Sequence, residues 1–193
     1  MSVICNENHQ YFEEGNRVPG FTEIVMALGI VKPNPFYTPD GRDQGTALHQ
    51  WLLFLAQGKE PADLPDERIA GRVEGIRKFL RESDFKFQGG EQPMFDKSIR
   101  FCCTPDLWGN MAGARCVIDA KRGAKLKHHA LQTAAQKLAL ASNGIHCRDR
   151  YTLYLKDGGY KLEQHTDAND MGRWQAIVAA YHAAQFYNTQ EKK

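Results

Sequence analysis

A short apolar stretch that ends in two charged residues most constrains the fold of this chain. Residues 116–121 read Cys-Val-Ile-Asp-Ala-Lys, and Val117 and Ile118 help to fix this stretch as a strand within a sheet. Because alternate residues of a strand point to the same face, Asp119 and Lys121 are expected to project together. The sequence therefore predicts a strand whose end presents a carboxylate and an amine to one shared site.

A second carboxylate precedes this strand by about one β-hairpin, in the segment Thr104-Pro105-Asp106. If the preceding strand brings Asp106 beside Asp119, two carboxylates face each other, which is unfavourable unless a cation neutralises them. A hard divalent metal ion is the natural occupant of such a site. Taken alone, the same pattern also arises by chance, as a turn followed by a solvated strand end.

These residues resemble the signature of the PD-(D/E)xK nucleases, with Pro105-Asp106 as its first half and Asp119-Ala120-Lys121 as its second. Two further segments resemble the RecB-type and lambda-exonuclease-like members of that superfamily. The histidine-bearing helix of those members is similar to Gly45-Thr46-Ala47-Leu48-His49, and their glutamine-bearing helix is similar to residues 131–138. The resemblance covers most of the chain through short motifs, and phage-type recombination exonucleases have the most similar size and layout.

The resemblance implies a metal site and a set of catalytic residues. The implied ligands of Mg²⁺ or Mn²⁺ are His49, Asp106, Asp119 and the backbone carbonyl of Ala120. Lys121 would orient the attacking water and counter the charge of the transition state. Without the resemblance, a lone histidine on an apolar helix is more often a core or capping residue than a ligand.

Two other polar residues are candidates for the same site. Glu91 resembles a position where many relatives carry a glutamate near the metal, and an exposed strand end beside Gly89-Gly90 is the alternative. Gln132 would hydrogen-bond the DNA or the water near the cut. Gln136 lies one helical turn further, on the same face, but relatives usually carry tyrosine there. Gln132 is therefore the better match, and an ordinary polar helix surface is the alternative for both glutamines.

The distribution of charge is more informative than its sum. The formal net charge of +2 is too small to indicate nucleic acid, but the motif-bearing half, from Arg115 to Arg150, is the basic half. We expect the DNA backbone to be bound there, with little readout of bases, by Arg122, Lys125, Lys127, His128 or His129, and Gln136. A solvated lysine-rich helix is the alternative.

Length and cysteine content bound the remaining possibilities. With 193 residues and 42% hydrophobic residues, the chain is expected to form a single domain over residues 1–193. Its five cysteines are an odd number without a secretory leader, which predicts free thiols in a reducing cytoplasm. Because none follows Cys147, no iron–sulfur cluster is expected. No segment is apolar enough to predict a membrane partner.

The periodicity of apolar residues predicts an α/β fold. Helices are expected over 22–30, 44–56, 66–81, 125–141 and 168–186, and strands over 90–96, 98–107, 114–121, 150–155 and 160–163. A proline-rich connection, Lys32-Pro33-Asn34-Pro35, separates the first two helices. This order contains the αβββαβ core that the resemblance implies: a restriction-endonuclease-like fold with a mixed central sheet flanked by helices and extra N-terminal helices.

The function implied by the resemblance is metal-dependent hydrolysis of DNA, most simply by an exonuclease of phage-type recombination or repair. A ring-shaped homo-oligomer and a partner that anneals single strands or promotes recombination would accompany such an enzyme. The alternatives are a restriction-like endonuclease, a nucleic-acid-binding module that keeps the fold without catalysis, and an assembly protein that uses the basic helix as its surface.

Overall fold

The computed structural model describes residues 3–6, 10–32 and 38–190. Residues 33–35 of the predicted proline-rich connection lie outside these ranges. The helices are α1 (Phe21–Ala27), α2 (Pro39–Ala56), α3 (Glu67–Glu82), α4 (His128–Ser142) and α5 (Asn169–Gln190). The strands are β1 (Val3–Cys5), β2 (Tyr11–Glu13), β3 (Asn16–Val18), β4 (Lys86–Gly89), β5 (Met94–Asp96), β6 (Phe101–Cys103), β7 (Leu107–Met111), β8 (Ala114–Lys121), β9 (Asp149–Lys156) and β10 (Gly159–Gln164).

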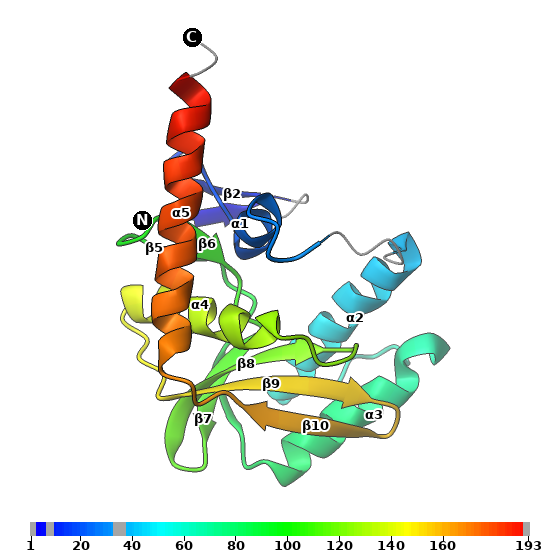
Figure 1. Cartoon of the computed structure of the whole chain (residues 1–193). Coiled ribbons are helices and arrows are strands. Elements are labelled where there is room, and N and C mark those ends of the chain that lie inside the picture. Colours follow the sequence, from blue (N-terminus) through cyan, green and yellow to red (C-terminus); the bar gives the residue numbers. More distant parts are fainter. Residues whose placement is uncertain (1–2, 7–9, 33–37, 191–193) are drawn as a thin grey trace.

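A five-stranded mixed sheet with the strand order β10-β9-β8-β7-β4 forms the centre of the molecule. Strands β8 and β9 are parallel, and the other neighbours are antiparallel. Helix α4 connects the two parallel strands, as a crossover must. The predicted mixed α/β class is confirmed, with helices on both faces of the sheet (Figure 1).

The alternation of side chains along β8 divides the core between the two faces of the sheet. Cys116, Ile118 and Ala120 pack against α2 and α3, whereas Val117 packs in the cluster that contains α4 and α5. Asp119 and Lys121 follow Val117 at intervals of two, so their side chains start on the α4 face. The predicted shared direction of these two residues is confirmed by the 2.8 Å separation of their charged groups.

The helices predicted from periodicity are confirmed, with shifts at their ends. Helix α2 begins at Pro39, five residues earlier than predicted, because the Thr38 side chain accepts a hydrogen bond from the Gly41 N–H and proline is suited to a first helical turn. Helix α3 has its predicted N-terminus, with Asp66 as the capping residue. No helix within the described ranges is long and apolar enough to cross a bilayer.

The strands predicted over 90–96 and 98–107 are wrong as members of the central sheet. Only β5 and β6 are extended there, and they pair with each other in a separate two-stranded sheet. The backbone turns at Glu91 and Arg100, whose φ angles are 52° and 58°, and this interrupts both segments. The central strands β4 and β7 were missed. Gly109 weakens the strand pattern of β7, yet a Cβ there would lie 2.2 Å from the Lys86 carbonyl oxygen.

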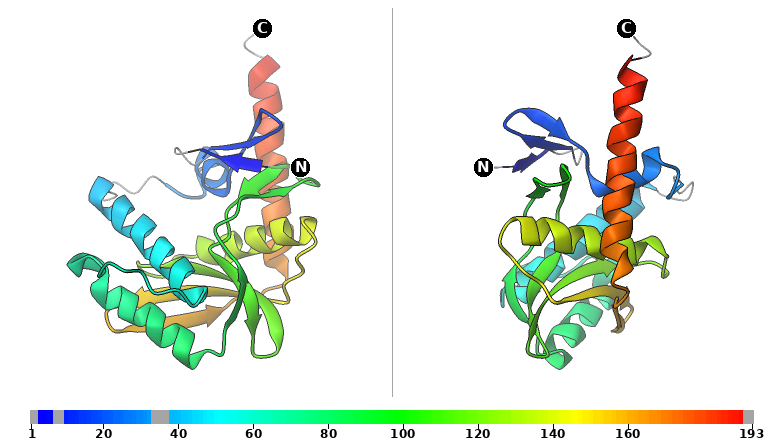
Figure 2. Two further views of the ribbon diagram at one scale, coloured as in Figure 1. Left: turned by 180° about the vertical axis from the view of Figure 1, so that it is seen from behind. Right: turned by 60° about the vertical axis from the view of Figure 1, so that its left-hand side comes forward.

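A second layer lies above the central sheet in Figure 1, and its first three strands, β1, β2 and β3, were not predicted. It consists of the three-stranded sheet β1-β2-β3, the β5-β6 pair and α1, and the long helix α5 runs beside it. Figure 2 shows the same arrangement from two other sides. Val18, Phe95 and Cys102 form its small core, while Cys103 points into the main cluster with α1, α4 and α5. Cys102 and Cys103 therefore point to opposite faces of β6.

Candidate metal centre

Three residues far apart in the sequence offer metal-ligating atoms at one end of the central sheet. His49 lies on α2, Glu91 follows β4, and Asp106 directly precedes β7. One ligand atom of each lies within 4.8 Å of the others. The His49 Nδ1 atom is 3.3 Å from Glu91 Oε1 and 3.3 Å from Asp106 Oδ1. An imidazole and two carboxylates are thus gathered at a single point.

A glycine explains how Glu91 comes so close to Asp106. A Cβ on Gly90 would lie 2.2 Å from the Asp106 carbonyl oxygen, so only glycine permits this approach. The Glu91 N–H then donates a 2.9 Å hydrogen bond to the Pro105 carbonyl oxygen, while Glu91 itself has a positive φ of 52°. Residues 90 and 91 therefore lie against the backbone that carries Asp106. An exposed, free strand end, which was the alternative for Glu91, would not need this contact.

Asp106 is buried and tied to the neighbouring strand. Its Oδ2 accepts a 2.6 Å hydrogen bond from the Ala120 N–H, which places it beside the Asp119-Ala120-Lys121 segment of β8. Burial alone would raise its pKa, but the attraction of His49 and, less strongly, of Lys121 lowers the pKa below its usual value. Attraction to Asp106 is in turn the main reason why the pKa of His49 lies well above its usual value. The pair is ionised at neutral pH.

Asp119 is fully buried, and both of its oxygens have close neighbours. Oδ2 lies 2.8 Å from Lys121 Nζ, and Oδ1 accepts a 3.0 Å hydrogen bond from Gln136 Nε2. Burial raises the pKa of Asp119, and the repulsion of Asp106 adds to it, although Lys121 opposes both effects. Burial would lower the pKa of Lys121, but its attraction to Asp119 and Asp106 leaves that pKa raised. Lys121 is therefore a cation beside two carboxylates.

Helix α2 is held against the end of β8 by polar and apolar contacts. Arg122, which follows β8, donates a 2.8 Å hydrogen bond from Nη1 to Gln44 Oε1 on α2. Leu48 and Leu52 are buried in the cluster formed with α3 and the sheet. His49 follows Leu48 but lies at the edge of this apolar cluster, where its side chain is 35% exposed. This position differs from that of a core histidine.

The residues predicted to bind DNA occupy different environments. Arg122, Lys125 and Lys127 are exposed in the segment between β8 and α4. Lys125 forms a 2.5 Å ion pair with Glu163. His128 is half-buried, whereas His129 is buried and lies 3.0 Å from the Tyr154 hydroxyl. These positions leave the three basic side chains available to a ligand at this end of the sheet.

The two glutamines of α4 are placed differently from what the sequence indicated. Gln132 is half-buried and lines a cavity beside the site. Gln136, for which a DNA contact was predicted, is only 1% exposed and is directed to Asp119. The apolar neighbours of Gln136, Ala135 and Ala139, are fully buried, and this apolar face was the available sign that Gln136 faces inward.

Fold and site together define a mixed α/β protein with an imidazole, three carboxylates and a lysine gathered at one end of its central sheet. Neither protein-family models nor curated proteins yielded a match to this chain.

Proposed function

We propose that this protein hydrolyses phosphodiester bonds of DNA with the help of a divalent metal ion. The observation that carries the proposal is the meeting of His49, Glu91 and Asp106 within 4.8 Å, next to the Asp119–Lys121 pair. Five ionisable groups, contributed by four separate segments, converge at a sheet end. Such a concentration of perturbed charges is typical of functional sites.

The residues present suit a hard or borderline divalent ion. Two carboxylates and one imidazole offer oxygen and nitrogen donors, which fits Mg²⁺ and especially Mn²⁺. Asp119 and the Ala120 carbonyl are proposed as further ligands from β8. An ion bound there supplies Lewis-acid polarisation of a phosphodiester and lowers the pKa of a water molecule.

The protein groups around this position have distinct proposed roles. Lys121 stabilises the negative charge that develops on the phosphate, because it is a cation held in place by a buried carboxylate. Gln136 keeps Asp119 oriented through its 3.0 Å hydrogen bond. Arg122, Lys125 and Lys127 are exposed on the segment that follows β8 and are proposed to bind the DNA backbone.

An exonuclease of recombination or repair is the preferred form of this activity. It is supported by the similarity of residues 45–49 and 131–138 to the histidine-bearing and glutamine-bearing helices of such enzymes. In the structure, these segments carry His49 and Gln136, both of which contact site carboxylates. The five free thiols suit a reducing compartment such as the cytoplasm.

The test compares linear duplex DNA with covalently closed circular DNA, each incubated with Mg²⁺ or Mn²⁺. We expect the linear form to be degraded and the circular form to survive. Asp106→Asn should reduce degradation at least about 100-fold, because it removes a charged ligand of the proposed ion. Asp84→Asn is the matched control, since Asp84 is exposed and accepts a hydrogen bond from the Ala112 N–H, at the end of β7 opposite Asp106.

Three results would contradict parts of this proposal. Full activity of Asp106→Asn would remove the metal assignment. Cleavage of the closed circle would favour an endonuclease instead. Tight DNA binding without cleavage under either metal would favour a nucleic-acid-binding module.

A further inference from the structure

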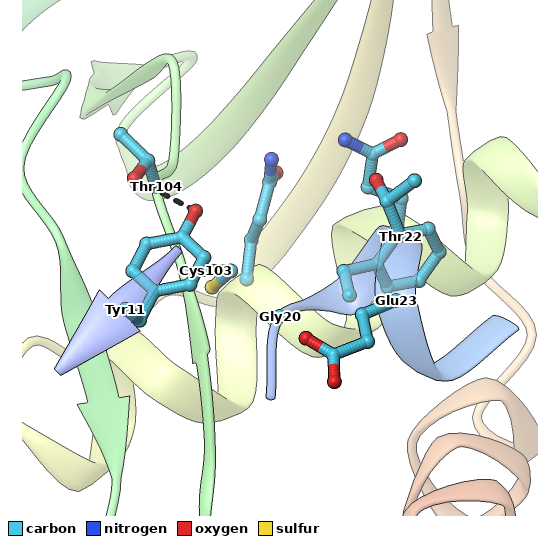
Figure 3. A pocket seen from close by; sticks show the side chains of 9 residues that line it. Tyr11, Gly20, Thr22, Glu23, Cys103 and Thr104 are labelled. Atoms are coloured by element: carbon cyan, nitrogen blue, oxygen red, sulfur yellow. Dashed lines mark hydrogen bonds between the residues drawn. The ribbon is translucent and has the colours of Figure 1, made fainter. Parts of the chain in front are cut away.

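A cavity of about 170 Å³ lies beside the candidate metal centre, between α4 and the second layer. Figure 3 shows Tyr11 and Thr104 on one side of it and Thr22 and Glu23 on the opposite side. Gln132 and Gln136 of α4 complete the polar part of its lining. Gly20 allows the cavity this shape, because a Cβ there would lie 2.8 Å from the Tyr11 ring.

Gln136 belongs both to the cavity and to the metal centre. Its Nε2 donates to Asp119, and this fixes the orientation of the amide, so that Oε1 must point elsewhere. Oε1 is buried and has no hydrogen-bond partner among the described residues. A buried carbonyl oxygen without a donor is unfavourable. Gln136 is therefore a lining residue of the cavity that has an unmet hydrogen-bonding group.

The charges of the lining disfavour an anion. None of the described residues that line the cavity is Lys or Arg, and one, Glu23, is a carboxylate. Glu23 is already engaged, because Arg17 and the Tyr181 hydroxyl donate to its two oxygens at 3.0 Å and 2.8 Å. A phosphate would therefore find no Lys or Arg among these described lining residues. An uncharged polar group suits these surroundings better.

The size and hydrogen-bonding groups of the cavity suit a planar ring. A cavity of about 150 Å³ is sufficient for benzene, so this one accommodates a six-membered ring. The hydroxyls of Tyr11 and Thr104, 3.1 Å apart, offer donors and acceptors on one side. Gln132 offers an amide. The edges of nucleobases carry both donors and acceptors in one plane.

We propose that this cavity receives the base of an unpaired nucleotide near the bond that is cleaved. The proposal rests on the proposed function, because it assigns a place to the substrate of that reaction. A base can enter only when it is out of the duplex stack, as at a single-stranded or frayed end. The cavity would therefore make this protein bind unpaired DNA in preference to duplex DNA. The proposed metal centre would lie next to the bound nucleotide.

The test measures binding of a short single-stranded oligonucleotide by fluorescence anisotropy in the presence of EDTA, so that no cleavage is needed. A set of oligonucleotides carries an abasic site at each position in turn. We expect one position at which loss of the base weakens binding about 5- to 100-fold, in keeping with the contribution of a single bound base.

Variants at the rim connect this effect to the cavity. Thr22 is exposed on α1 and lines the cavity, so Thr22→Phe should block entry without disturbing the core. In this variant, intact and abasic oligonucleotides should bind equally weakly. Ala27→Phe places the same ring on an exposed position of α1 that does not line the cavity. It should behave as the wild type, and thermal melting verifies that both variants fold.

The outcomes separate this inference from the proposed function. If the wild type binds every abasic oligonucleotide as well as the intact one, or if Thr22→Phe keeps the position-specific effect, the cavity does not bind a base, whether or not DNA is cleaved. If a 5′-phosphate strengthens binding and Thr22→Phe abolishes that gain, the cavity is a phosphate site and the proposal is overturned. A position-specific effect on binding, without cleavage under Mg²⁺ or Mn²⁺, would support base binding in the cavity and contradict the proposed hydrolysis.

Discussion

At the scale of single residues, His49 is the group whose protonation matters most. Its Nδ1 lies 3.3 Å from an oxygen of Glu91 and 3.3 Å from an oxygen of Asp106, and its pKa is raised well above the usual value, mainly by Asp106. Below that raised pKa, the imidazole is a cation between two carboxylates. A metal ion bound as proposed would therefore compete with this proton for the same position.

This competition gives a prediction for metal binding. Because a bound ion must release the His49 proton, the Mn²⁺ concentration at half-maximal activity should fall as pH rises toward the raised pKa. His49→Ala should raise that concentration about 10- to 100-fold, since a ligand is lost, and should flatten its dependence on pH. Titration of activity against Mn²⁺ at several pH values measures both effects. An unchanged midpoint together with a lower melting temperature would make His49 a structural residue only.

Lys121 gives a second prediction at this scale. If it stabilises charge in the transition state, Lys121→Ala should lower kcat about 100- to 1000-fold. The dissociation constant for DNA should change far less, because several other basic residues contact the backbone. Lys125→Ala is the matched control, since Lys125 is exposed and pairs with Glu163, not with a carboxylate of the site. This variant should weaken DNA binding with little effect on kcat. Parallel losses in Lys121→Ala would make it a docking residue.

Much of the candidate site followed from the sequence because strand geometry has a fixed period. The alternation of β8 placed Asp119 and Lys121 together, and a short connection placed Asp106 beside them. The role of Gln136 did not follow, because its direction depends on how α4 rotates against the sheet. The position of Glu91 depended on close backbone approach at Gly90, which no periodicity reveals.

At the scale of secondary-structure elements, Arg150 connects three of them: β9, α4 and α5. This buried residue of β9 donates to the Ala130 carbonyl of α4, to the Asp167 carbonyl, and to Asp170 in the first turn of α5, at 2.8 Å, 2.9 Å and 2.9 Å. The guanidinium is only 3% exposed. A buried charge of this kind is stable only while its partners remain in place.

Removal of one partner should therefore loosen α5. We expect Asp170→Ala to lower the free energy of unfolding by about 3–5 kcal/mol, because it leaves the Arg150 charge buried and incompletely paired. The control is Glu74→Ala, whose ion pair with Arg77 lies on the surface of α3, and which should change the free energy by less than about 1 kcal/mol. Urea unfolding followed by circular dichroism measures both. Equal effects of the two substitutions would show that Arg150 does not depend on Asp170.

The long elements were easier to predict, because the helical or strand periodicity of the sequence repeats several times within each of them. Helices α3 and α5 span 16 and 22 residues, and the hairpin of β9 and β10 alternates over its whole length. Strands β1, β2, β3, β5 and β6 have 3 residues each. Three residues cannot establish an alternation, and such strands exist only because distant segments pair with them.

At the scale of the whole molecule, buried histidines determine stability in mild acid. Burial, reinforced by Lys121, lowers the pKa of His129 to about 4, and burial also lowers those of His128 and His165. Above pH 6.5, His129 is neutral in both the folded and the unfolded protein. As pH falls from 6.5 toward 4, the unfolded state takes up the proton first, so the folded state loses stability.

This contribution is expected to be at most about 3 kcal/mol, fully lost near pH 4. The contribution of His49 has the opposite sign and is complete below pH 6.5, so it does not alter this interval. His129→Gln removes the titrating group and should reduce the slope of stability between pH 6.5 and 4. Urea unfolding at half-unit steps of pH compares the two proteins. Superimposable pH profiles would show that His129 does not contribute.

The hydrogen bond from Tyr181 to Glu23 has a consequence for how the protein is made. It joins residues 158 positions apart and holds α1, which forms one wall of the cavity, against α5. At a synthesis rate of about 5–20 residues per second, α1 leaves the ribosome roughly ten to thirty seconds before its partner is complete. Every element of the metal centre is translated within that interval. The residues of the candidate metal centre are thus synthesised before Tyr181, the residue that holds this wall of the cavity against α5.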